Sequence, residues 1–169
     1  MSYSTIKAVW PGQKSEKLEE LANSHGLAPV VWGTFAERYL GGRNNWLFKS
    51  EELWPLANRS DIPVGLRAVL IMTFDKVYVE KKDYPRAAAD IEAFLQVAPS
   101  PPNHVNHWPR IVEIFKSNPD VPAIGFWCTS VSEDPYLGDW NEEIEEYNQP
   151  NWDDFASVYD QDILAADRP

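Results

Sequence analysis

The sequence predicts an α+β fold: a single domain with a mixed or antiparallel sheet, packed helices, and an ordered acidic, aromatic-rich C-terminal region. Strand-like alternation and short apolar runs are interspersed with segments of helical periodicity, which predicts both kinds of element. The length of 169 residues suits one domain with a sizeable core. Because residues 1–169 contain no internal repeat, low-complexity tract or interdomain linker, we expect one domain that includes the acidic region 133–169.

The first part of the chain combines strand and helix signals. Apolar and polar residues alternate over 3–10, which predicts a strand that ends at the following Pro-Gly pair. Leu18, Leu21 and Ala22 lie on one helical face, which predicts a helix that stops at Gly26. Shorter elements are expected beyond it: strands at 30–32 and 46–48, a turn-rich loop at 41–45 and a helical turn at 50–52.

The middle of the chain has the clearest patterns. The apolar run 69–72 predicts a central strand buried on both faces, and 77–79 predicts a strand paired with it across a tight turn. Residues 123–128 predict another buried strand. Two helices are expected, one starting at Asp83 and one over 107–116, with prolines 99, 101 and 102 marking a rigid loop between them. Their core-facing residues are expected to be Ile91, Phe94 and Leu95, and Trp108, Val112 and Phe115.

The net charge of the protein lies entirely at its C-terminal end. Residues 133–169 hold twelve of the 26 acidic residues and one of the 15 basic residues, which gives this segment the full net charge of −11. The preceding residues are therefore neutral. Such a distribution favours a cationic protein partner and argues against nucleic acid, whose phosphates would be repelled.

The acidic region also contains aromatic residues, which predicts that it is folded, because acidic tails are poor in aromatics. Asp139 and Glu142 resemble a capping box, and Trp140, Ile144 and Tyr147 then fall on one helical face. A second helix is expected after an Asn151 cap, with Asp153 and Asp154 in its first turn. Its apolar stripe is expected to be Trp152, Phe155, Tyr159 and Ile163, and residues 165–169 are expected to fray.

Several protein classes are excluded by the sequence. No apolar stretch approaches the length of a membrane helix, and the first residues lack the pattern of a signal peptide, so we expect a cytoplasmic protein. The single cysteine, Cys128, excludes an internal disulfide framework and suits a reducing compartment. The net charge favours a monomeric free protein.

The residues offer little support for catalysis, so we predict no enzyme, catalytic residue, metal or cofactor. His104 and His107 are spaced like metal ligands but supply only half of a zinc site. Cys128 lies in a predicted buried strand, where a thiol serves packing. One enzymatic alternative stays open, a glycosidase-like hydrolase that uses carboxylates of the acidic region beside sugar-stacking aromatics.

The favoured hypothesis is a binding protein that neutralises a basic partner by placing carboxylates and aromatics on a cationic site. Nuclease inhibitors have this character, because a nuclease site is cationic in order to hold phosphate. A regulatory module that binds a basic peptide is a weaker alternative. The candidate partner-binding residues are Glu133, Asp134, Tyr136, Asp139, Trp140, Glu142, Glu143, Glu145, Glu146, Tyr147, Trp152, Asp153 and Asp154.

The length, the order of strands and helices and the tryptophan content support a family resemblance, which includes the stretches Val30-Val31-Trp32-Gly33 and Ala123-Ile124-Gly125-Phe126-Trp127. In these respects the chain resembles bacterial polymorphic-toxin immunity proteins, in particular immunity family fifty-two, the partners of restriction-endonuclease-like toxins, some delivered by type VI secretion. The resemblance implies a cytoplasmic inhibitor of a nuclease toxin that acts in interbacterial competition. It assigns no role to any residue.

Overall fold

The computed structural model describes residues 1–98 and 103–161, which are built around a mixed five-stranded sheet. The strand order is β2-β1-β4-β3-β7, and all neighbours are antiparallel except β3 and β7, which are parallel. The strand bounds are β1 Tyr3–Trp10, β2 Lys14–Ala22, β3 Val77–Glu80, β4 Ala123–Trp127 and β7 Ala156–Ser157. A separate two-stranded hairpin consists of β5 Trp140–Asn141 and β6 Glu146–Tyr147.

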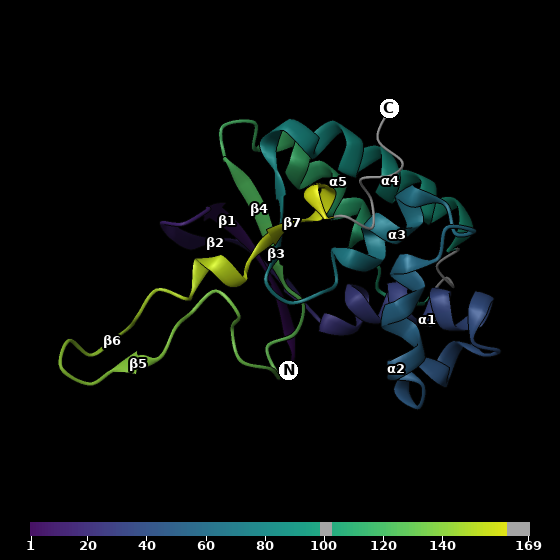
Figure 1. Cartoon of the computed structure of the whole chain (residues 1–169), viewed down its shortest axis with the longest axis horizontal. Helices are drawn as coiled ribbons and strands as arrows, with labels where there is room; N and C mark the ends of the chain where they lie inside the picture. The colour runs from purple at the N-terminus through teal and green to yellow at the C-terminus, as the bar shows by residue number, and fades with distance from the viewer. Residues whose placement is uncertain (99–102, 162–169) are drawn as a thin grey trace.

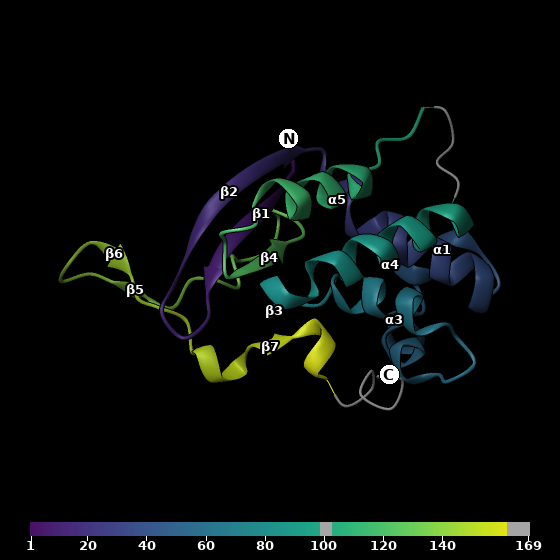
Figure 2. The same ribbon diagram turned by 90° about the horizontal axis from the view of Figure 1, so that it is seen from above.

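The helices gather on one side of the sheet, and the β5–β6 hairpin extends away from the body on the other side (Figures 1 and 2). The α-helices of the described residues are α1 Ala28–Tyr39, α2 Ser50–Leu53, α3 Val64–Ile71, α4 Tyr84–Val97 and α5 Trp108–Ser117. No helix within residues 1–98 and 103–161 combines the length and the apolar character that crossing a membrane requires. The architecture is the predicted α+β class, in one compact domain.

Side chains of the sheet alternate between two apolar layers, as strand geometry requires. Ile124 and Phe126 of β4 belong to the large core that the helices cover. Ala123, from the same strand, belongs to a second cluster on the opposite face, together with Val9 of β1 and Tyr136. Tyr78, Trp152 and Phe155 pack against this second cluster. The segment from Tyr136 to Phe155 is therefore ordered because it covers the second face of the sheet.

Tyr136 fixes this covering segment to the sheet. Its side chain is only 1% exposed, and its hydroxyl donates a hydrogen bond to the carbonyl oxygen of Val77 (2.7 Å) and accepts one from the amide of Phe126 (2.9 Å). The phenol lies over Gly125, where an added Cβ would overlap the hydroxyl. Glycine is required at this position for the close approach of a ring to the sheet.

A second contact, an ion pair between Lys7 of β1 and Asp134, lies beside Tyr136. The Lys7 Nζ is 2.5 Å from the Asp134 carboxylate, and the two side chains are only 10% and 7% exposed. A buried charge is costly without a partner, so each of these residues needs the other. The pair joins the first strand of the sheet to the beginning of the acidic region.

The predicted helix containing Leu18, Leu21 and Ala22 is wrong, because these residues lie in β2. The Gln13 amide donates to the carbonyl oxygen of Trp10 (2.9 Å), and Gly12 adopts a positive φ of 78°, so the chain turns back along β1. Charged side chains along β2 suit the edge of a sheet, where they oppose pairing with another chain. The apolar spacing that matched a helix therefore belongs to an edge strand.

The predicted strands at 30–32, 46–48 and 69–72 are also wrong. Residues 30–32 belong to α1, which starts with Pro29 in its first turn, where the fixed φ of proline favours a helix. Residues 43–47 form a 3-10 helix that includes most of the second segment. The run 69–72 covers the end of α3 and is buried on all sides, a pattern that a fully buried helix shares with a central strand.

Other predicted elements are confirmed. The strand at 3–10 is β1, the strands at 77–79 and 123–128 correspond to β3 and β4, and the helical turn at 50–52 begins α2. The two long helices are α4 and α5. However, β3 pairs with β4 and β7, and not with residues 69–72. The proline loop at 99–102 lies outside the described residues.

We expect Tyr136→Phe to lower the free energy of unfolding by about 1–3 kcal/mol, because it leaves the buried Phe126 amide and Val77 carbonyl without their shared partner. Urea denaturation measures the loss. Tyr147→Phe removes the same hydroxyl from an exposed ring and is the matched control, with an expected change within about 0.5 kcal/mol. Equal stability of the two variants would contradict the bridging role of the Tyr136 hydroxyl.

Candidate functional site

The projecting hairpin is the most distinctive surface feature of the protein (Figure 1). We call residues 138–149 the acidic arm. Its two sides are joined by the β5–β6 pairing and by backbone hydrogen bonds from Gly138 to Asn148 (2.8 Å) and from Asn148 to Asp139 (2.9 Å). Gly138 is required at the base of the arm, because a Cβ there would overlap the backbone of Gln149.

The predicted helix over 139–147 is therefore wrong, and the arm instead reverses through a four-residue turn, 142–145. The side chain of Asn141 accepts a hydrogen bond from the Glu143 amide (3.0 Å), an Asx turn that competes with helix formation. Glu145 adopts a left-handed conformation, with φ of 54°, which closes the turn and which a helix does not permit. The spacing of Trp140, Ile144 and Tyr147 therefore does not describe a helical face.

The predicted second helix is reduced to one 3-10 turn, Trp152–Asp154. Its predicted cap is present, since the Asn151 side chain accepts from the Asp153 amide (3.3 Å). The chain then becomes extended and pairs with β3 as β7, so the helix does not continue. Tyr159 is buried and donates to the Asp90 carboxylate of α4 at 2.6 Å, which fixes the end of the described chain. Ile163 and residues 165–169 lie outside the described residues.

The arm displays an aromatic pair. Trp140 and Tyr147 face each other across the hairpin with ring centroids 5.0 Å apart and an interplanar angle of 72°. Both remain about half exposed, at 51% and 53%, and Ile144 is also exposed in the turn. Large half-exposed aromatic rings are the preferred anchors of protein interfaces.

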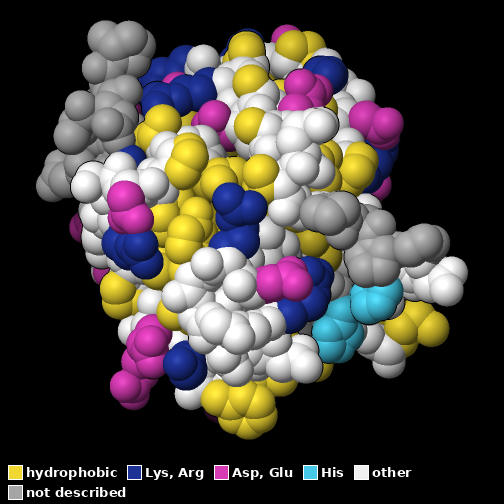
Figure 3. All heavy atoms as spheres, turned by 90° about the vertical axis from the view of Figure 1, so that its right-hand side faces the viewer, with side chains coloured by type: hydrophobic (Ala, Val, Ile, Leu, Met, Phe, Trp, Pro, Cys, Tyr) yellow, Lys and Arg dark blue, Asp and Glu magenta, His cyan; other side chains and the backbone are white. Residues whose placement is uncertain are grey.

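The arm is also strongly negative. It carries five exposed carboxylates and no Lys or Arg, and within the described residues none of the five forms an ion pair. They are Asp139, Glu142, Glu143, Glu145 and Glu146. On the face turned away from the arm, by contrast, acidic and basic side chains are interspersed (Figure 3). The arm is thus a projecting element that carries five negative charges and no positive side chain.

An acidic cleft of about 400 Å³ lies at the base of the arm. Glu133, Asp134 and Asp139 line it together with the rings of Trp127, Trp140 and Tyr147. The Asp134 charge is neutralised by Lys7, but Glu133 and Asp139 are exposed and unpaired among the described residues. The indole N–H of Trp127 is buried without a hydrogen-bond partner in the described part of the chain. The cleft therefore extends the acidic and aromatic character of the arm onto the body.

The predicted partner-binding residues consequently divide into three groups. The first group consists of the predicted residues on the arm, which share one exposed surface with Glu133 in the cleft. Tyr136 and Asp134 are buried and support that surface from below. Trp152 is partly buried against Phe155, with centroids 4.8 Å apart, and Asp154 pairs with Lys76 (3.0 Å). Asp153 is exposed beside them.

Two contributors to the site were not predicted from the sequence. Lys7 anchors the base of the arm, but its place in an alternating strand gave no signal of a distant carboxylate partner. Ile144 was assigned to an apolar helical face, and the structure places it in the exposed turn. The four glutamates around Ile144 are the signal that favours an exposed position.

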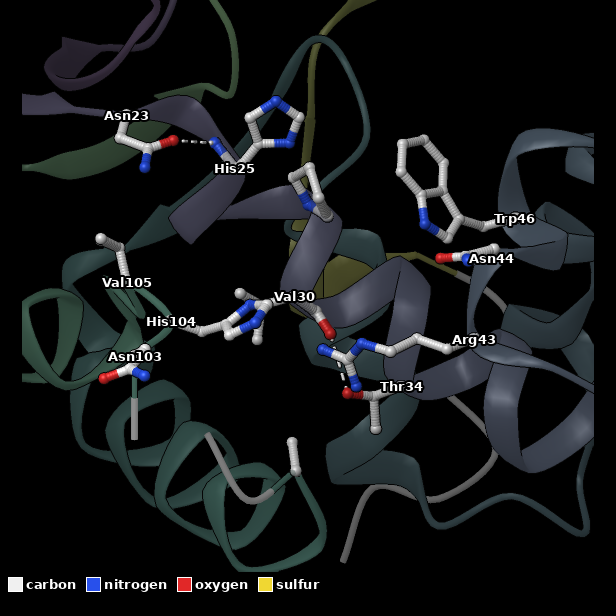
Figure 4. Close-up of a pocket in the computed structure, with 12 residues that line it drawn as sticks. Asn23, His25, Val30, Thr34, Arg43, Asn44, Trp46, Asn103, His104 and Val105 are labelled. Atoms are coloured by element: carbon white, nitrogen blue, oxygen red, sulfur yellow. Dashed lines mark hydrogen bonds between the residues drawn. The ribbon is translucent and has the colours of Figure 1, made fainter. Parts of the chain in front are cut away.

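The histidines do not converge on one site. The His107 ring nitrogen contacts the backbone carbonyl oxygens of Ala22 and Asn23 at 2.9 and 3.0 Å, so this ring has a structural role. His104 lines a separate polar pocket of about 270 Å³, where it extends toward Arg43 from the opposite side (Figure 4). Across the parts of the chain that the structure describes, no group of three or more His, Cys, Asp or Glu side chains is arranged to hold a metal ion.

Cys128 is buried, as predicted. Burial raises the pKa of its thiol to about 12, and the nearby Asp75 carboxylate contributes in the same direction. The thiol is therefore neutral at physiological pH, which disfavours nucleophilic chemistry.

Comparisons with protein-family models, curated proteins and solved structures found no match to this chain. The resemblance to immunity proteins therefore stays a prediction, and the case for a function depends on the site itself.

We expect Trp140→Ala to change the free energy of unfolding by less than about 1.5 kcal/mol, because Trp140 contacts its aromatic partner on an exposed arm. Trp108→Ala is the matched control: Trp108 is fully buried, so its loss is expected to cost about 3–5 kcal/mol. Thermal and urea denaturation measure both. If the two losses are similar, Trp140 belongs to the core and the arm is not a free surface.

Proposed function

We propose that this protein is an immunity protein that binds and neutralises a cationic bacterial toxin, with a nuclease as the expected toxin class. The acidic arm enters or covers the cationic site of the toxin, and the protein performs no catalysis itself. The proposed place of action is the cytoplasm, where a nuclease toxin meets nucleic acid.

The observation that carries this proposal is the concentration of unpaired carboxylates and half-exposed aromatic rings on one projecting hairpin. Unpaired carboxylates attract a cationic partner over a Debye length of about 8–10 Å at moderate salt. Steering of this kind can raise association rates roughly 10- to 1,000-fold. Desolvation of Trp140 and Tyr147 then slows dissociation.

The composition of the arm also suits a nuclease as partner. A nuclease holds phosphate with positive charge, and the arm presents several carboxylates close together in sequence, three of them in the turn 142–145. The projecting shape allows the turn 142–145 to reach into a groove, while the cleft at the base of the arm accommodates the rim of the partner. The buried supports, Tyr136 and the Lys7–Asp134 pair, limit the conformational entropy lost on binding.

The hydrolase alternative predicts turnover that depends on single carboxylates, whereas the binding proposal predicts that several carboxylates act together through their field. Assays of purified protein on oligosaccharides separate the two. Turnover that disappears in one Glu→Gln variant would favour the hydrolase.

The most direct experiment is co-expression with the product of the neighbouring gene, tested for restored growth and for a co-purifying complex. We expect protection with the full chain. A variant in which residues 140–147 are replaced by a short Gly-Ser turn is expected to fold but to lose protection. Full protection by this variant would contradict a role for the arm.

We expect Glu→Gln substitution at positions 142, 143, 145 and 146 together to slow association with the toxin and to flatten its salt dependence between roughly 50 and 500 mM. Stopped-flow fluorescence or surface plasmon resonance measures both quantities. Slower association with unchanged dissociation is the signature of lost electrostatic steering.

The matched control substitutes four exposed glutamates on the helical side of the molecule, Glu51, Glu52, Glu92 and Glu113. Both quadruple variants neutralise four carboxylates and therefore change the net charge from −11 to −7. We expect the control to associate nearly as fast as the unmodified protein. Equal slowing in the two variants would show that total charge, and not the arm, determines the rate.

A further inference from the structure

A third cavity, of about 480 Å³, lies between α1, the α3–β3 connection and the end of β4. It borders the acidic cleft, since Ser132 lines both. Its lining differs from that of the cleft, because apolar and aromatic surface predominates and one carboxylate is present. The lining residues are Trp32, Trp54, Thr73, Phe74, Asp75, Cys128, Thr129 and Ser132.

Three aromatic rings line this cavity, and the ring of Trp54 stands nearly perpendicular to the other two. The Trp54 ring lies 5.6 Å from Trp32 at an interplanar angle of 82°, and 5.5 Å from Phe74 at 89°. A corner between two perpendicular rings is bounded by the face of each ring. The faces of aromatic rings carry the negative part of the ring quadrupole, and they attract cations.

The walls are held in place before any ligand arrives. The indole N–H of Trp32 donates to the Thr73 hydroxyl at 2.9 Å, and that hydroxyl donates to the carbonyl oxygen of Leu70 at 2.6 Å. Trp46 also packs against Trp32, with ring centroids 5.1 Å apart. A preformed pocket loses little entropy when a ligand binds.

The carboxylate of the cavity lacks a protein cation. Asp75 is exposed, and in the described part of the chain no Lys or Arg lies within ion-pairing distance of it. The adjacent Lys76 is directed elsewhere, toward Asp154 at 3.0 Å. Because the Cys128 thiol is neutral, the Asp75 charge is the one negative charge among the lining side chains.

We propose that this aromatic cavity binds an alkylated ammonium cation, which contacts the faces of Trp32, Trp54 and Phe74 and pairs with Asp75. The cation belongs either to a free small molecule or to a lysine-derived side chain of a protein partner. The site is independent of the proposed toxin binding, since it uses none of the residues of the acidic arm.

Titration of the full-length protein with choline tests the proposal, with 3,3-dimethylbutan-1-ol as the uncharged ligand of the same shape. We expect choline to bind about tenfold more tightly than the alcohol, by isothermal calorimetry and by shifts of the indole N–H signals of Trp32 and Trp54 in NMR spectra. The indole signals of Trp10 and Trp140 are expected to stay in place. Equal affinity for the two ligands, or no binding of choline up to millimolar concentration, would overturn the proposal.

Two variants identify the groups responsible. Asp75→Asn is expected to reduce the preference for choline over the alcohol about fivefold or more, and Trp54→Leu is expected to remove binding of choline. Asp120→Asn is the matched control, since this exposed carboxylate precedes β4 at the opposite end of the strand from Cys128. Thermal denaturation confirms that each variant is folded. A preference that survives in folded Asp75→Asn would also overturn the proposal.

A second pair of ligands distinguishes the two sources of the cation. A short peptide containing trimethyl-lysine or lysine represents a protein side chain, and choline represents a free metabolite. Tighter binding of the peptide assigns the site to a protein partner, and tighter binding of choline assigns it to a small molecule. For either assignment, the proposal still requires that choline binds more tightly than the uncharged alcohol.

Discussion

The close approach of the Tyr136 phenol to the sheet at Gly125 is the constraint on which the rest of the structure depends. The hydroxyl joins β3 to β4 by bonding to a carbonyl of one and an amide of the other. This contact requires glycine in the middle of a buried strand, and it brings Asp134 within reach of Lys7. The second face of the sheet is thereby covered without a second layer of helices. An acidic segment that would repel itself in isolation is held in place by a few buried groups.

The same anchoring explains how a charged surface can be displayed in a defined position. The arm begins two residues after Tyr136, and its base is closed by backbone hydrogen bonds around Gly138. The aromatic pair Trp140–Tyr147 stabilises the two-residue strands, which are too short to be stable alone. Carboxylates are then placed where no cation of the described chain neutralises them. The acidic cleft at the base of the arm and the aromatic cavity share a border at Ser132, so their ligands would approach from adjacent directions.

The sequence predicted correctly those elements whose residue pattern is compatible with only one kind of secondary structure. The long helices α4 and α5 have clear apolar stripes, and the fold class, the strand β1 and the folded state of residues 133–161 of the acidic region followed from pattern and composition. Errors arose where two structures share a pattern. The run 69–72 is apolar at every position, so it shows neither the helical period of 3.6 residues nor the strand period of two. The spacing of Leu18 and Leu21 matched a helix by coincidence, although both residues lie in an edge strand. In the acidic region, the Asx turn at Asn141 and the left-handed Glu145 override the helical spacing. The arm residues were identified by composition, but their geometry and the partnership of Lys7 with a residue 127 positions away depend on tertiary contacts.

The order of the layers has a consequence for how the protein is made. During translation, β1 to β4 and the α-helices α1 to α5 leave the ribosome before the segment that covers the second face of the sheet. Until Asp134 and Tyr136 emerge, Lys7 has no counter-charge, and Val9 and Ala123 stay in contact with water. The nascent chain therefore carries an uncovered apolar patch that only its final quarter can close, and this interval is when it is most exposed to chaperones and to self-association.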